Sequence, residues 1–165
     1  MSGIIIPDSI KTIGSTAFYD CDNLTTVTIP DSVTSLGANL FDKCDKLTAV
    51  TLPSSLTALA DYTFMNCPKL TTVAIPETVT AIGKGCFQNC TALTALTLPA
   101  SLTAVGDCAF YGSAVAELAL PASLTAESIG QYLVAMDSAT VLVVAEGSAA
   151  AAYAEANQLN YRLAD

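Results

Sequence analysis

Hydrophobic residues recur along this chain at a fixed period. Phenylalanine occupies every 23rd position from Phe18 onward, at Phe18, Phe41, Phe64, Phe87 and Phe110. Proline keeps the same spacing at Pro7, Pro30, Pro53, Pro76 and Pro99, and Pro121 follows one position earlier than this spacing requires. A fixed period of this size predicts a stack of similar coils, each of which can bury its apolar face only against its neighbours.

Two segments of each coil have the pattern of short strands. In LTTVTIP (residues 24–30), Val27 and Ile29 alternate with Thr28, which predicts a strand with one buried face. The proline that follows ends the strand, because it has no N–H to donate to a ladder. SVTSLG (residues 32–37) predicts a second extended segment on the opposite wall, ended by a glycine suited to an unusual backbone turn.

The third segment of the coil carries a repeated cysteine. STAFYDCDNL (residues 15–24) places Ala17, Phe18, Cys21 and Leu24 at spacings that favour a short helical or 3₁₀ turn with these residues inward. In a stack, copies of one position lie above one another at roughly the 4.8 Å strand spacing. We therefore expect a column of cysteines, formed by Cys21, Cys44, Cys67 and Cys90, with Ser113 in the fifth copy.

The pattern breaks after residue 126, where Glu127 takes an expected core position. Beyond it, the sequence predicts a strand over residues 140–145, a turn at Gly147 and a helix that begins after an N-cap at Ser148. This alanine-rich helix bears Tyr153 and is followed by Leu159 and Tyr161, so we expect it to cover the last layer. The predicted organisation is one domain, with repeats over residues 1–126 in about five full coils plus partial ends and a C-terminal cap over residues 127–165.

The recurring unit resembles a known repeat family. The pattern L-x-x-V-x-I-P, with leucine at Leu52, Leu96 and Leu98 in place of isoleucine or valine, combines with A-F-x-x-C over residues 4–125. Together they resemble the BspA-like, Treponema pallidum-type leucine-rich repeats, and the ending EGS…YA…N is similar to the caps of that family. The resemblance implies a right-handed solenoid and a bacterial cell-surface or secreted protein involved in adhesion.

Composition narrows the possible functions. The chain has 165 residues, no histidine and a formal charge of −9, which disfavours nucleic acid and anionic lipid as partners. No apolar run is long enough for membrane insertion. Without histidine the commonest general base and metal ligand is missing, so we expect no enzyme activity and no cofactor. The N-terminus MSGIIIPDS lacks an export signal, so we expect either a cytosolic protein or a fragment of a longer exported one.

The cysteines and acidic residues admit alternatives to a structural role. Parallel Cβ vectors favour free thiols in the column over disulfides or a metal, but a bond between Cys86 and Cys108 remains conceivable. The acidic residues of the first three coils could form a calcium site, although interleaved lysines favour a solvated surface. These acids are Asp20, Asp22, Asp42, Asp45 and Asp61.

The leading functional hypothesis is a non-catalytic module that binds a protein or glycan. The outward face of the strands consists mainly of threonine and alanine, which lack the large side chains of binding hot spots. The expected partner-binding edge is instead Tyr19, Tyr62, Met65 and Tyr111, beside the F-x-x-C turns. The alternative is a structural spacer that presents another domain of a longer protein. Because SGIIIP begins inside a repeat, either further repeats precede it or the uncapped N-terminal coil self-associates.

Overall fold

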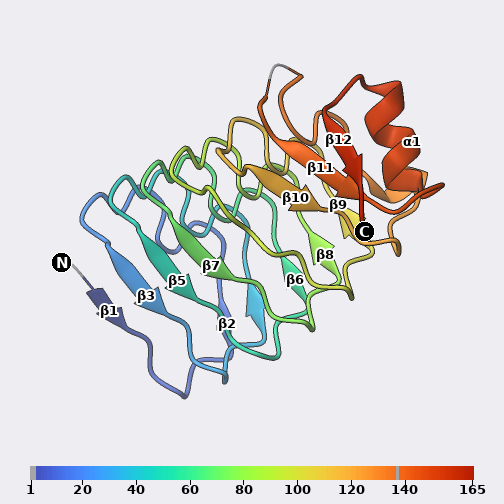
Figure 1. Ribbon diagram of the computed structural model, residues 1–165. Helices are drawn as coiled ribbons and strands as arrows, with labels where there is room; N and C mark the ends of the chain where they lie inside the picture. The colour runs from blue at the N-terminus through green and yellow to red at the C-terminus, as the bar shows by residue number, and fades with distance from the viewer. Residues whose placement is uncertain (1–2, 137) are drawn as a thin grey trace.

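The front wall of the molecule is a parallel sheet built from successive coils. The computed structural model describes residues 3–136 and 138–165. Strands β1 (Gly3–Ile5), β3 (Thr26–Thr28), β5 (Ala49–Thr51) and β7 (Thr72–Ala74) pair in that order, with Val27, Val50 and Val73 in register. Val27 is buried between exposed Thr26 and Thr28, as the alternation predicts. The parallel solenoid with a coil of about 23 residues is confirmed (Figure 1).

The front sheet is interrupted in the fifth coil. The repeat predicts a strand at Ala95–Thr97, but the structure assigns none there, and the next front strand is β10 (Glu117–Ala119). Two differences in sequence coincide with this gap. Leu96 and Leu98 replace the β-branched residues found at most of these positions in earlier coils, which fit a pleated surface better. The spacing from Leu96 to Leu118 is also one residue shorter than the repeat.

The second wall consists of two-residue strands, and glycine controls how closely they approach. The strands are β2 (Thr12–Ile13), β4 (Ser35–Leu36), β6 (Ala58–Leu59), β8 (Ala81–Ile82) and β9 (Ala104–Val105). A Cβ atom at Gly83 or Gly106 would lie 2.5 Å from a backbone nitrogen of the preceding coil. Neither glycine has a positive φ. The expected reason for these glycines, an unusual turn, is therefore wrong, because close packing between coils requires them.

Ala60 shows what happens where that glycine is replaced. The second wall divides at this point, with β2 and β4 in one sheet and β6, β8 and β9 in another. The N–H groups of Gly83 and Gly106 each donate to the preceding coil over 2.8 Å. Within residues 3–136, Ala60 makes no such bond to Leu36. The missing bond thus coincides with a methyl group at a position where glycine otherwise touches backbone.

The F-x-x-C segments form tight turns rather than the short helical or 3₁₀ pieces expected. The residues two before and two after each phenylalanine have positive φ, for example Thr16 (60°) and Asp20 (58°) around Phe18. Phe18 N–H donates to Leu40 C=O of the next coil over 3.0 Å. Successive turns are therefore linked to one another by some of their N–H groups, while others bond within the turn, such as Tyr19 N–H to Thr16 C=O over 3.0 Å. The phenylalanine rings stack in a column with centroids 5.3–5.6 Å apart.

The C-terminal end closes the stack. The coil geometry continues past residue 126 through a 3₁₀ turn, η1 (Ala126–Ser128), after which Ile129 bridges Val105. Glu127 is exposed and Ile129 is buried, so the expectation that Glu127 takes a core position is wrong. Strand β11 (Val141–Val144) and helix α1 (Ala149–Ala156) confirm the predicted strand and helix, and the Ser148 side chain caps the helix.

A second strand of the cap was not anticipated. β12 (Tyr161–Leu163) pairs in parallel with β11, which in turn pairs with β10 (Figure 1). Leu159 is buried, whereas Tyr161 is 38% exposed and donates its hydroxyl to Glu155 over 2.7 Å. Tyr161 therefore stabilises the cap from its surface through this hydrogen bond, and it is not the core residue that we expected.

Candidate functional site

Three of the four cysteines in the column are part of the packing. Cys44, Cys67 and Cys90 are fully buried, and each thiol donates to the phenylalanine C=O of the preceding coil over 3.0–3.1 Å. Burial raises the pKa of the Cys44 and Cys90 thiols from 9.0 to about 12, and it raises the pKa of Cys67 as well. A thiol that keeps its proton is neither a nucleophile nor a metal ligand. The recurrent cysteine therefore supplies a small side chain that satisfies a buried carbonyl.

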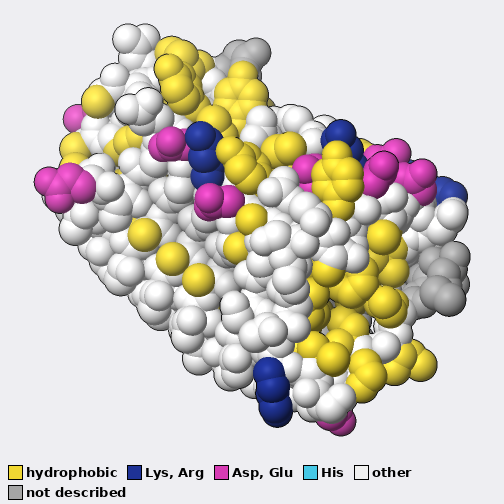
Figure 2. Space-filling model, turned by 180° about the vertical axis from the view of Figure 1, so that it is seen from behind, with side chains coloured by type: hydrophobic (Ala, Val, Ile, Leu, Met, Phe, Trp, Pro, Cys, Tyr) yellow, Lys and Arg dark blue, Asp and Glu magenta, His cyan; other side chains and the backbone are white. Residues whose placement is uncertain are grey.

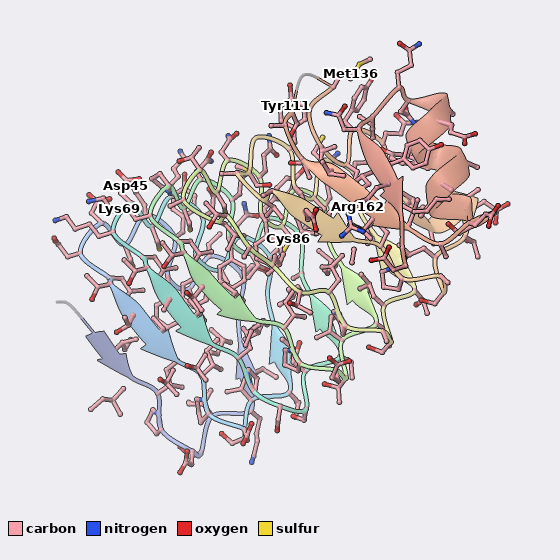
Figure 3. The ribbon with its side chains drawn as sticks, viewed as in Figure 1. Asp45, Lys69, Cys86, Tyr111, Met136 and Arg162 are labelled. Carbon is pink, nitrogen blue, oxygen red and sulfur yellow. The ribbon has the colours of Figure 1, made fainter. Side chains whose placement is uncertain are left out.

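The two cysteines outside the column differ from each other. Cys86 is fully buried, and burial raises the pKa of its thiol (Figure 3). Cys108 is half-buried with φ of 55°, at the position that Thr16 and Tyr62 occupy in other coils. All six cysteines are free, so the conceivable bond between Cys86 and Cys108 is not formed.

The expected binding residues all lie on one edge of the molecule. We call this the turn edge: residues 16–21, 39–44, 62–67, 85–90, 108–113 and 132–136, the tight turns that lead from the second wall to the front wall. Tyr19, Met65 and Tyr111 share one position of the repeat, two coils apart from one another. Tyr62 belongs to the position three residues earlier in the repeat. The turn edge therefore brings the four residues onto one surface.

Two of these tyrosines are engaged by the next coil. The ammonium group of Lys43 lies 5.3 Å from the centre of the Tyr19 ring, and the hydrogen bond between them raises the pKa of Lys43. Tyr62 is half-buried, and a Cβ atom at Gly85 would lie 2.6 Å from Cδ1 of its ring. Tyr62 thus covers Gly85, and its role in packing accounts for its position.

The C-terminal half of the turn edge is more open. Tyr111 is 41% exposed, Tyr132 61% and Met136 69%. Tyr111 and Met136 both project from this edge away from the stack (Figure 3). Tyr132 and Met136 were not anticipated, because the recognisable sequence pattern ends at residue 126. Aligning Ile129 with Val105 would have found Tyr132, which then falls in the column of Tyr62 and Cys108.

One of the acidic residues considered for calcium is buried in a polar network. Asp42 is only 3% exposed and accepts hydrogen bonds from the amides of Asn39 and Asn66 over 3.2 and 3.1 Å. Asn89 extends the network by donating to Asn66 over 2.9 Å. The amide donors satisfy this carboxylate without a cation. Across residues 3–136 and 138–165, no group of three or more acidic or cysteine side chains is arranged to hold a metal ion.

The first coil exposes apolar surface at the N-terminal end of the stack. Ile4 and Ile10 are 37% and 36% exposed, and Phe18 and Cys21 are only partly buried. Figure 2 shows hydrophobic side chains gathered at the end of the molecule beside the grey N-terminal residues. Self-association through this coil stays a prediction. None of the helices in the described residues has the length and apolar character needed to cross a membrane.

Comparison with known protein families identifies the repeat. The model of the BspA type leucine rich repeat region matches the chain in 6 copies, over residues 1–116 and 57–140. No curated protein matches the chain significantly.

Solved structures of bacterial proteins share the fold. A leucine-rich repeat protein from Bacteroides ovatus superposes with a TM-score of 0.83 at 24% identity, covering 99% of this chain and 42% of that one. The T. pallidum leucine-rich repeat protein gives a TM-score of 0.71 at 22% identity, covering 99% and 85%. A leucine rich cell surface protein from Faecalibacterium prausnitzii gives 0.55 at 33% identity, covering 73% and 39%. The chain thus spans less than half of two of these proteins.

Proposed function

Because the chain belongs to the family of BspA-type leucine-rich repeat proteins, we propose that it is a non-catalytic recognition module of a bacterial surface protein. The module binds a protein partner through the C-terminal half of the turn edge. The similar protein from Faecalibacterium prausnitzii, which is described as a cell surface protein, supports the location.

The exposure of Tyr111, Tyr132 and Met136 carries this proposal. Tyrosine and methionine are enriched in the cores of protein interfaces, where they bury a large area on binding. The front wall offers a different surface, since its outward residues are small, for example Thr28, Thr51 and Ala74. A partner therefore gains more buried apolar area on the turn edge than on the front wall.

The chemistry of the side chains supports a role without catalysis. The chain lacks histidine, and the buried thiols are held in their neutral form by their raised pKa values. Neither a serine nor a cysteine thus has an imidazole base to activate it.

The proposal can be tested with two matched surface variants. The first combines Tyr111→Ala, Tyr132→Ala and Met136→Ala on the turn edge, and the second combines Thr28→Ala, Thr51→Ala and Thr72→Ala on the front wall. Binding of each to a panel of immobilised extracellular-matrix proteins is measured by biolayer interferometry. We expect the first variant to bind at least about tenfold more weakly than the native protein, as hot-spot truncation does, and the second to bind normally.

The alternative of a structural spacer makes the opposite prediction. A spacer needs a rigid stack and no ligand, so the native protein would bind none of the panel. Equal binding by all three proteins would place the partner elsewhere on the surface. Either result contradicts recognition through the turn edge.

A further inference from the structure

A cleft lies between the last coil and the cap. Its volume is about 560 Å³, and one side is formed by η1 and the segment that follows it, while α1 forms the other. The polar and aromatic side chains of its lining are Asp107, Glu127, Gln131, Tyr132, Tyr153 and Asn157. In contrast to the flat front wall, this part of the surface is concave and mixed in character.

The cleft is located where the repeat pattern changes. The step from Val105 to Ile129 is one residue longer than the same step in the earlier coils. Two residues are added between Leu124 and Ile129, around η1, and one is lost between Phe110 and Leu118. Tyr132 takes a position whose side chain varies between coils, where the earlier copies are Thr16, Asn39, Tyr62, Gly85 and Cys108. Packing of the stack therefore requires neither the added residues before Ile129 nor a tyrosine at position 132. Residues that packing does not require can take part in binding a ligand.

The lining includes two carboxylates and two tyrosines, and no lysine or arginine belongs to it. Asp107 Oδ1 accepts the Gln131 N–H over 2.7 Å, which fixes the carboxylate at the edge of the cleft, and Glu127 is exposed. The Tyr153 hydroxyl accepts the Leu133 N–H over 3.1 Å. Burial raises the pKa of Tyr153, with a smaller contribution from the negative charge of Asp107. The Tyr153 hydroxyl thus lies within the field of that carboxylate and keeps its proton available to donate.

Among the described residues, no lysine or arginine forms an ion pair with Asp107 or Glu127. Lys84 occupies the position of Asp107 one coil earlier, but no ion pair joins the two among the described residues. The single arginine, Arg162, pairs with Glu117 over 3.0 Å on the sheet formed by β10, β11 and β12. A ligand that enters the cleft therefore meets negative charge that the protein itself does not neutralise.

We propose that this cleft binds an organic ammonium group. An ammonium group carries three donors for the carboxylate and amide oxygens, and its charge offsets the cost of removing Asp107 and Glu127 from water. The exposed ring of Tyr132 adds a cation–π surface. A lysine side chain of a protein partner and a free amine share this chemistry. The choice of a lysine side chain rests on the proposed function, whereas binding of a free amine does not.

Titration with small amines, followed by backbone amide signals of the whole chain, tests this inference. Cadaverine represents a free amine, and 1,5-pentanediol is its neutral isostere. N-acetyl-lysine amide represents a partner side chain, with N-acetyl-norleucine amide as its neutral counterpart. We expect saturable shifts at Gln131 and Asn157 with both amines and none with either neutral compound.

Matched charge variants separate a site from general electrostatic attraction. Glu127→Gln and Asp107→Asn should each weaken cadaverine binding roughly fivefold, as expected for loss of one charge partner. The amide oxygen introduced by Asp107→Asn can still accept the Gln131 N–H. Glu77→Gln removes the same charge beside the front wall and should leave binding unchanged. Shifts spread over many acidic residues, equal weakening by Glu77→Gln, or equal binding of the neutral isosteres would each overturn the proposal.

The amine titration and the protein-binding panel together distinguish the amine site from the proposed function. Binding of both amines with no capture of a protein on the panel would retain the cleft and reject partner recognition. Binding of cadaverine but not of N-acetyl-lysine amide would assign the cleft to free amines.

Discussion

The coils from Phe18 to Phe110 and the last coil use the same backbone path for different purposes. In the former, the inward positions are repeated: the phenylalanine rings form a continuous column, and the thiols form one as far as Cys90. In the last coil, Val134 takes the place of phenylalanine and Tyr132 is 61% exposed. Repetition accounts for stability, and the departures from it mark the residues that are available for recognition.

The largest expected effect of a single substitution lies in the phenylalanine column. Phe64 is fully buried and stacks on both Phe41 and Phe87. Phe64→Ala should lower the free energy of unfolding by about 3–5 kcal/mol, because it leaves a cavity between two rings. Urea unfolding monitored by circular dichroism measures this. A loss below about 1 kcal/mol would show that the column is not the main source of stability.

Alkaline pH should destabilise the repeated coils next. The folded pKa of Cys44 and Cys90 is raised to about 12 from 9.0, so the unfolded chain loses these protons first as pH rises. The contribution to stability is fully present below pH 9 and is lost as pH rises from 9 to about 12. Each thiol should lower the free energy of unfolding by about 1.4 kcal/mol per pH unit in this range.

Urea unfolding between pH 8.5 and 10 checks this slope. Cys44→Ala should make it shallower. An identical slope in that variant would mean that other groups cause the loss.

Glycine in the second wall should give the next effect. A methyl group at Gly83 would lie 2.5 Å from backbone of the preceding coil, so Gly83→Ala should cost about 1–3 kcal/mol. We also expect it to divide the wall as Ala60 does. Hydrogen exchange at the Gly83 and Thr80 amides reports the ladder directly, and unchanged protection there would refute the explanation given for Ala60.

The smallest effect on stability is expected at the turn edge of the last coil. Because Tyr132 is largely exposed, Tyr132→Ala should change the free energy of unfolding by less than about 0.5 kcal/mol. Thermal unfolding measures the change, with Phe110→Ala as the matched core substitution. A loss comparable to that of Phe110→Ala would make Tyr132 a structural residue.

Sequence and structure agree on which side chains of most repeated positions face the core. The period of phenylalanine and proline was enough to predict the coils, the buried faces of the strands and the cysteine column. The capped helix followed from local signals at Ser148 and Gly147, which act within a few residues.

The differences arise where neighbouring coils determine the outcome. The turn around Phe18 is spaced like a helix, but the N–H groups of Thr16, Phe18 and Asp20 bond to the next coil, which a pattern within one coil cannot reveal. The role of glycine in the second wall could not be predicted for the same reason, since the backbone that each glycine touches belongs to the preceding coil. Tyr132 and the cleft were missed because a one-residue deletion before Leu118 and a two-residue insertion before Ile129 conceal the sixth copy of the pattern.

A comparison of cadaverine binding by Cys67→Ala and Tyr132→Ala tests the division of roles most directly. Cys67→Ala should bind cadaverine as the native protein does, because the Cys67 side chain is buried and does not line the cleft. Tyr132→Ala should bind about threefold to tenfold more weakly through loss of the cation–π contact. Unchanged binding by Tyr132→Ala together with weakened binding by Cys67→Ala would contradict the account.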